Sequence, residues 1–130
     1  MTLGNIHEAL YQTLTAQCPT VTWSQRLLER PTNTTIWGAI TFDGAPKRSL
    51  VDYNRQYVYF KLWIYMDTED ETLLVNKAEE AANVVHDKLI SGKGTGKVRF
   101  ICTGISPVFF AEEYQQRGIT VSLRTLTTSI

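Results

Sequence analysis

The sequence is poor in the residues that build metal and redox sites. It has two histidines and two cysteines among its 130 residues, and none of the four is followed by another at the i+3 or i+4 spacing of a local metal site. A reducing cytoplasm would leave Cys18 and Cys102 as thiols. We therefore predict no metal site, no cofactor and no disulfide framework.

An excess of one charge and a long apolar run are also missing. Thirteen basic residues balance thirteen acidic ones, so the strong positive field that supports non-specific nucleic-acid binding is absent. No segment approaches the ~20 apolar residues of a membrane span, and the first ten residues lack the pattern of a secretory signal. These features predict a cytoplasmic product without a membrane partner.

No catalytic motif is complete. The glycines of SGKGTGK, residues 91–97, resemble a phosphate loop, but that motif needs a glycine in place of Ser91 and opens a helix. The residues around Ser106 begin like a nucleophile elbow and lack its closing glycine. We therefore predict that the protein is not an enzyme.

The length and composition predict one globular domain, residues 1–130. The chain has a mass of 14.8 kDa and is 43% hydrophobic, and a chain of this mass buries about two-thirds of its unfolded surface.

Hydrophobic periodicity predicts the secondary structure. The order is α-β-β-β-α-β-β, which indicates an α+β fold with two helices on one face of a mainly antiparallel sheet. The first helix is expected over Asn5–Gln17, and the second has a buried stripe of Leu74, Ala78, Ala81, Ala82, Val85 and Leu89. Strands are expected over Thr20–Ser24, Thr35–Phe42, Tyr53–Met66, Val98–Ser106 and Gly118–Thr127, the last two forming a terminal hairpin.

Two connections carry charge. Asp43–Asp52 is rich in turn formers and predicts a long hairpin loop. Asp67–Glu71 places four carboxylates where the second helix begins, which the helix dipole favours.

The strand Tyr53–Met66 has one face of the ordinary apolar kind and one unusual face. The unusual face carries five aromatic side chains and two cations. Such side chains bury well against a partner and tolerate water. Two interpretations remain open: helices of the same domain cover this face, or a partner does. The residues of the unusual face are Tyr53, Arg55, Tyr57, Tyr59, Lys61, Trp63 and Tyr65.

The order of these segments resembles a known family over nearly the whole chain. The matching segments are IHEALYQTLTAQ, RQYVYFKLWIYM with the acidic helix start after it, AEEAANVVHDKLI, and RGITVSLRTLT. In this order they resemble the small tail-terminator or tail-completion proteins of long-tailed bacteriophages.

The resemblance implies a subunit of a ring, generally of six copies, on the last ring of tail-tube protein. Such a ring ends tube polymerisation and offers the surface to which the head-neck connector protein attaches. The protein would then lie in the host cytoplasm during assembly and later in the virion. DNA would pass through the ring lumen without specific binding.

The candidate site follows from this interpretation. The aromatic face would cover either the helix layer or the ring interface. The loop cations Lys47 and Arg48 would contact carboxylates of an adjacent subunit, and the glycine loop would become ordered on the tube or neck. The candidate interface residues are Lys47, Arg48, Tyr57, Tyr59, Lys61, Trp63, Tyr65, Glu69, Asp70, Glu71, Lys93 and Lys97.

Two alternatives stay open at this point. The first is another head-tail connector or a minor capsid component, because these are also small, neutral α+β ring subunits. The second, from a different class, is a module that stacks single-stranded nucleic acid on Tyr57, Tyr59, Trp63 and Tyr65.

Overall fold

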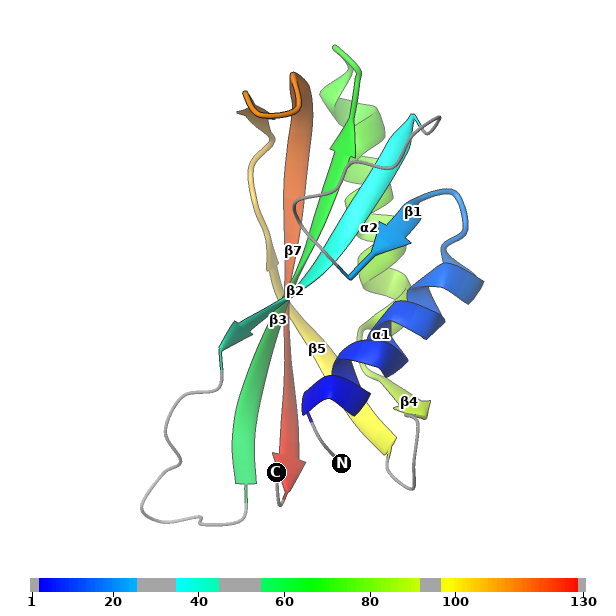
Figure 1. Cartoon of the computed structure of the whole chain (residues 1–130), viewed down its shortest axis with the longest axis vertical. Helices are drawn as coiled ribbons and strands as arrows, with labels where there is room; N and C mark the ends of the chain where they lie inside the picture. Colours follow the sequence, from blue (N-terminus) through cyan, green and yellow to red (C-terminus); the bar gives the residue numbers. More distant parts are fainter. Residues whose placement is uncertain (1–2, 26–34, 45–54, 92–96, 129–130) are drawn as a thin grey trace.

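The computed structural model shows one twisted sheet with two helices on one of its faces (Figure 1). It describes residues 3–25, 35–44, 55–91 and 97–128. In chain order the elements are α1 (Leu3–Gln17), β1 (Thr22–Ser24), β2 (Ile36–Gly44), β3 (Arg55–Met66), α2 (Glu71–Val85), β4 (Lys88–Ser91), β5 (Lys97–Ile105), β6 (Phe109–Ala111) and β7 (Gln116–Thr128).

The sheet has the strand order β1-β2-β3-β7-β5-β4, with β6 beside β7. Among the strands of the described residues, the short β1 is parallel to β2 and the other strand pairs are antiparallel. The long strands β3 and β7 pair from Arg55↔Thr128 to Met66↔Arg117 and form the centre of the sheet. The predicted α+β fold is confirmed, including the terminal β5–β7 hairpin, and β4 and β6 are short additions to the expected order.

The core lies between this sheet and the two helices. Alternate side chains of β3 and β7 point toward the helices and are buried, as the alternation predicts. The alanines of α2 let the helix approach the sheet closely. These three elements contribute the following residues to this core: Val58, Phe60, Leu62, Ile64, Met66, Leu74, Ala78, Ala81, Ala82, Val85, Ile119, Val121 and Leu123.

The prediction that Leu89 continues the helical stripe is wrong. The helix α2 ends at Val85, and Leu89 lies on β4 with 58% of its surface exposed. The chain leaves the helix because Asp87, at a φ of 55°, joins the sheet through its N–H and the Phe100 carbonyl, 2.7 Å apart. Arg99 donates to the carbonyl and the carboxylate of Asp87 and holds this turn.

The predicted acidic start of the second helix is confirmed. Asp70 is the N-cap, and its carboxylate accepts a hydrogen bond from the Thr72 N–H at 3.0 Å. Glu71 adds a negative charge to the first turn, where the helix dipole favours it.

Other boundaries differ slightly from prediction. Helix α1 begins at Leu3, two residues before the expected start. Of the predicted loop Asp43–Asp52, Asp43 and Gly44 belong to β2, and residues 45–52 lie outside the described residues. In the part of the chain that the structure describes, no helix has the length and apolar character needed to cross a membrane.

Candidate functional site

The face of the sheet opposite the helices, called here the outer face, carries the aromatic side chains of β3. The β3–β7 register sets Trp63 opposite Thr120 and Tyr59 opposite Arg124 on this face. In Figure 1 both helices lie on the other side of the sheet. The helix layer therefore does not cover the aromatic face, which excludes the first of the two interpretations.

The arm, defined as β6 with the turn 112–115, covers one end of the outer face (Figure 1). The rings of Trp37 and Tyr65 stack with centroids 4.6 Å apart, and Tyr114 packs edge-on 4.8 Å from Trp37. Phe109 meets Tyr65 edge-on at 6.2 Å. Tyr65 is consequently only 3% exposed, and neither sequence interpretation anticipated that the chain's own arm would cover it.

The contact between arm and sheet is buried, since Trp37 and Ala111 are almost inaccessible to solvent. Burial raises the pKa of Tyr65, and the neighbouring Tyr114 and Glu113 raise it further. Trp37 donates from Nε1 to Oε1 of the buried Gln116 at 2.8 Å. The Nε2 atom of Gln116 is buried and has no hydrogen-bond partner among the described residues.

The opposite end of the outer face is open. Tyr57 is 44% exposed there and Tyr59 is half-buried, with their ring centroids 6.5 Å apart. The Arg124 guanidinium lies 5.0 Å from the centre of the Tyr57 ring, within the range of a cation–π contact. Lys61 lies 5.4 Å from the Trp63 ring and 3.9 Å from the Asp43 carboxylate.

A hollow of about 220 Å³ lies beside this open end. Two arginines line it, together with Tyr57 and Ile101. Asp87 holds Arg99 by contacts of 2.8 and 2.9 Å to its Nη1 atom. Arg124 has no carboxylate partner among the described residues, so its charge faces the hollow and the Tyr57 ring.

Sequence reasoning missed both Arg99 and Arg124 as site residues. Each lies in a strand that shows ordinary alternation when read alone. Arg124 lies opposite Tyr59 of β3 on one side and opposite Ile101 of β5 on the other. Each of these pairs joins residues more than twenty positions apart in the sequence. No local pattern signals that proximity.

The other predicted site residues are spread over the molecule. Glu69, Asp70 and Glu71 are exposed at the far end of β3 from Tyr57, so they do not pair with the open end of the outer face in one copy. Lys97 is exposed at the start of β5. The remaining predicted cations, Lys47, Arg48 and Lys93, lie outside the described residues.

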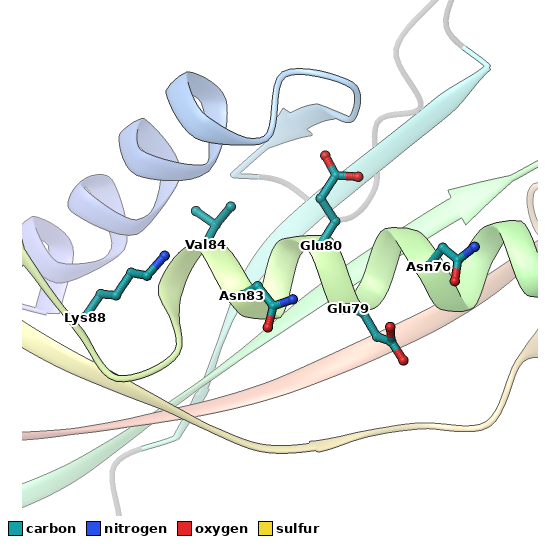
Figure 2. A pocket seen from close by; sticks show the side chains of 6 residues that line it. All are labelled: Asn76, Glu79, Glu80, Asn83, Val84 and Lys88. Carbon is teal, nitrogen blue, oxygen red and sulfur yellow. The ribbon is translucent and has the colours of Figure 1, made fainter.

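A second hollow, of about 470 Å³, runs along α2. Glu80 and Val84 rise from one side of the helix and Glu79 and Asn83 from the other (Figure 2). Glu80 is already engaged, because it accepts hydrogen bonds from Lys77 and Thr20. The polar side chains that line this hollow do not converge on one point (Figure 2). The lining residues are Asn76, Glu79, Glu80, Asn83, Val84 and Lys88.

The cysteine beside this helix is not an activated nucleophile. Burial raises the pKa of the Cys18 thiol, and the charge of Glu80 raises it further. A raised pKa keeps the thiol protonated and poorly reactive. Within the described ranges, no group of three or more His, Cys, Asp or Glu side chains could hold a metal ion.

Comparison with known proteins identifies solved structures with the same fold and no matching sequence family. No protein-family model matches the chain, and no curated protein matches it. A chain from the solved virion of a native gene transfer agent particle superimposes with a TM-score of 0.67. This protein has the fold of that virion chain.

The likeness to the virion chain spans almost both molecules. It covers 97% of this chain and 96% of the other, at 13% sequence identity. A second solved chain, described only by a sequence identifier, gives a TM-score of 0.61 at 12% identity, and the match covers 98% of this chain and 93% of that one. At these identities the comparisons establish a shared fold.

Proposed function

We propose that this protein is a structural subunit of a phage-like virion that forms a ring on the end of the tail tube. The ring ends tube polymerisation and presents the surface to which the head-neck connector attaches. The observation that carries the proposal is the shared fold with the gene transfer agent virion chain over 97% of the present chain. The sequence resemblance to tail-terminator proteins selects this role among virion subunits.

The outer face supports an assembly role. Its open end presents exposed Tyr57, half-buried Tyr59 and the arginines of the hollow. Tyrosine and arginine are enriched at protein interfaces, where they combine apolar area with polar contacts. A ring requires such a surface, because each subunit must bury part of itself against the next.

The first experiment is light scattering after size exclusion, over a range of protein and salt concentrations, with negative-stain images of any assembled fraction. A closed ring of six copies has a mass of about 89 kDa, six times 14.8 kDa. Rings of this size, seen end-on with a central hole, are the expected result.

The second experiment adds the protein to polymerising tail-tube protein of the same particle. The expected result is shorter tubes with a ring at one end. A protein that stays monomeric and neither binds nor shortens tubes contradicts the proposal. Binding to connector or portal protein instead of tube would assign it to another position in the neck.

The open end of the outer face also defines the test of the nucleic-acid alternative. Salt-sensitive binding of a single-stranded oligonucleotide that disappears in Tyr57→Ala would favour that function. Tyr57 is the better probe, because Trp63 is half-buried and donates from its indole N–H to Thr41 at 2.9 Å.

A further inference from the structure

We propose that the hollow between Arg99 and Arg124 binds the acidic tip of the arm from a second copy of this chain. The arm tip is defined as Glu112 and Glu113, and the guanidinium hollow as Tyr57, Arg99, Ile101 and Arg124. The inference rests on the proposed function, since it names the contact that would join neighbouring subunits of the ring.

The guanidinium hollow is suited to a carboxylate. Arg124 has no carboxylate partner among the described residues and lies over the Tyr57 ring. Arg99 uses its Nη1 atom for Asp87, which fixes the side chain and leaves its other N–H donors. Two guanidinium groups offer the planar fork that binds carboxylates with two parallel hydrogen bonds. Tyr57 and Ile101 add apolar walls to the hollow.

The arm tip is a preformed ligand for such a hollow. Glu112 and Glu113 are exposed, and no cation pairs with either in the part of the chain described here. The turn that carries them is closed by the Gln115 side chain, whose Nε2 atom donates to the Glu112 carbonyl at 2.8 Å. Tyr114 anchors the same turn to Trp37 and Tyr65, so the backbone of the turn loses little further entropy on binding.

One chain cannot make this contact with itself. The arm tip precedes Gln116, at one end of β7, and Arg124 lies eight residues further along the same strand. At about 3.3 Å per residue the two sites are roughly 26 Å apart. Figure 1 shows the arm at one end of the sheet and the start of β5 at the other.

The two surfaces therefore join different copies head to tail. A contact between two unlike surfaces of the same chain is heterologous, and it closes into a ring when the rotation between copies allows it. The charges fit this arrangement, since the arm end also carries Asp67, Glu69, Asp70 and Glu71. The tip of one copy meets the basic hollow of the next, and like-charged surfaces stay apart.

Charge reversal tests the inference directly. Arg124→Glu makes the hollow less basic, and the double variant Glu112→Lys with Glu113→Lys makes the tip basic. Each variant alone is expected to weaken self-association about tenfold at low salt. Mixing the two variants pairs an acidic tip with an intact hollow and a basic tip with the reversed hollow, so association is expected to recover.

The matched controls are Glu79→Lys on α2 and Lys88→Glu on β4. Both residues are exposed, and both line the hollow on the helix side, away from the outer face. Neither control is expected to change self-association. Loss of association in the controls as well would indicate a general effect of charge and would overturn the inference.

Cross-linking makes the test independent of affinity. In a Cys102→Ser background, Glu113→Cys and Ile101→Cys are purified separately and mixed at high protein concentration under mild oxidation. The expected product is a disulfide between the two variants, formed faster than in a mixture of Glu79→Cys with Ile101→Cys. Equal rates would overturn the inference.

The outcomes separate this inference from the proposed function. The protein could form rings while charge reversal leaves self-association unchanged and the predicted disulfide forms no faster than the control disulfide. In that case the proposed function stands and this contact is wrong. If an oligonucleotide occupies the hollow and blocks the cross-link, the site binds phosphate and the inference is overturned. Absence of any association at millimolar concentration also overturns it, while the tube-capping experiment still decides the proposed function.

Discussion

Substitution of Gly118 by alanine should release the arm from the sheet. Gly118 lies on β7 beneath the arm and has no left-handed φ, so alanine is acceptable for the backbone. The substitution is instead opposed by steric overlap with neighbouring side chains. A Cβ atom at this position would lie 2.7 Å from Phe109 Cζ and 2.9 Å from Tyr65 Cδ1.

The size of the effect follows from these distances. Ordinary contact requires about 3.5–4.0 Å between carbon atoms, so the Phe109 ring would have to retreat by roughly 1 Å. Tyr65 cannot move away, because it belongs to the central strand β3 and stacks on Trp37. Overpacking of this kind costs about 1–3 kcal/mol. The cost cannot exceed the free energy of docking the arm, because the arm can detach while the main core remains intact.

The assay is urea unfolding followed by tryptophan fluorescence, together with hydrogen exchange of the β6 amides. A loss of about 2 kcal/mol lowers the urea midpoint by about 1 M, since the slope is about 2 kcal/mol/M for a domain of this size. If the arm opens locally, its amides exchange faster while the midpoint changes less.

The control is Gly104→Ala, because a Cβ atom at Gly104 would meet nothing within 4 Å. We expect its free energy of unfolding to stay within about 0.5 kcal/mol of the parent protein. The reasoning is refuted if Gly118→Ala shows neither a lower midpoint nor faster exchange of β6 than Gly104→Ala.

Two further predictions concern the helix cap and the buried phenol. Asp70→Ala should lower the free energy of unfolding by about 1 kcal/mol in thermal or urea denaturation, because it removes the N-cap of α2, whereas Asp67→Ala, outside the helix, should change it little. Because the pKa of Tyr65 is raised in the folded protein, its contribution to stability is present at neutral pH and is lost as the pH rises above about 10. Urea midpoints from about pH 8 to about pH 11 should therefore fall, and Tyr65→Phe should flatten that fall; an equally steep profile in the variant would show that other groups cause it.

The sequence predicted those features that depend on local periodicity. The alternation along β3 identified both of its faces, and the stripe from Leu74 to Val85 identified the buried side of α2. The acidic run identified the helix start, because a carboxylate at the N-cap satisfies a backbone N–H within two residues. Each of these signals is contained in a single segment.

Periodicity failed where a distant segment competed with the local pattern. The spacing places Leu89 on the helix stripe, but pairing with β5 takes the chain out of the helix before that residue. The arm gave only a weak signal, since β6 is three residues long and is held by aromatic contacts to Trp37 and Tyr65 from elsewhere in the chain.

The sequence by itself determined the α+β class, the two helices, the main strands and the existence of an aromatic face on β3. The tertiary structure alone decided which part of that face is open, because the arm buries Tyr65 and leaves Tyr57 exposed. It also decided that Arg99 and Arg124 share one hollow. The physical reason is that strand register and the position of the arm arise from pairing between distant segments, whereas periodicity reports only which side of its own element a residue occupies.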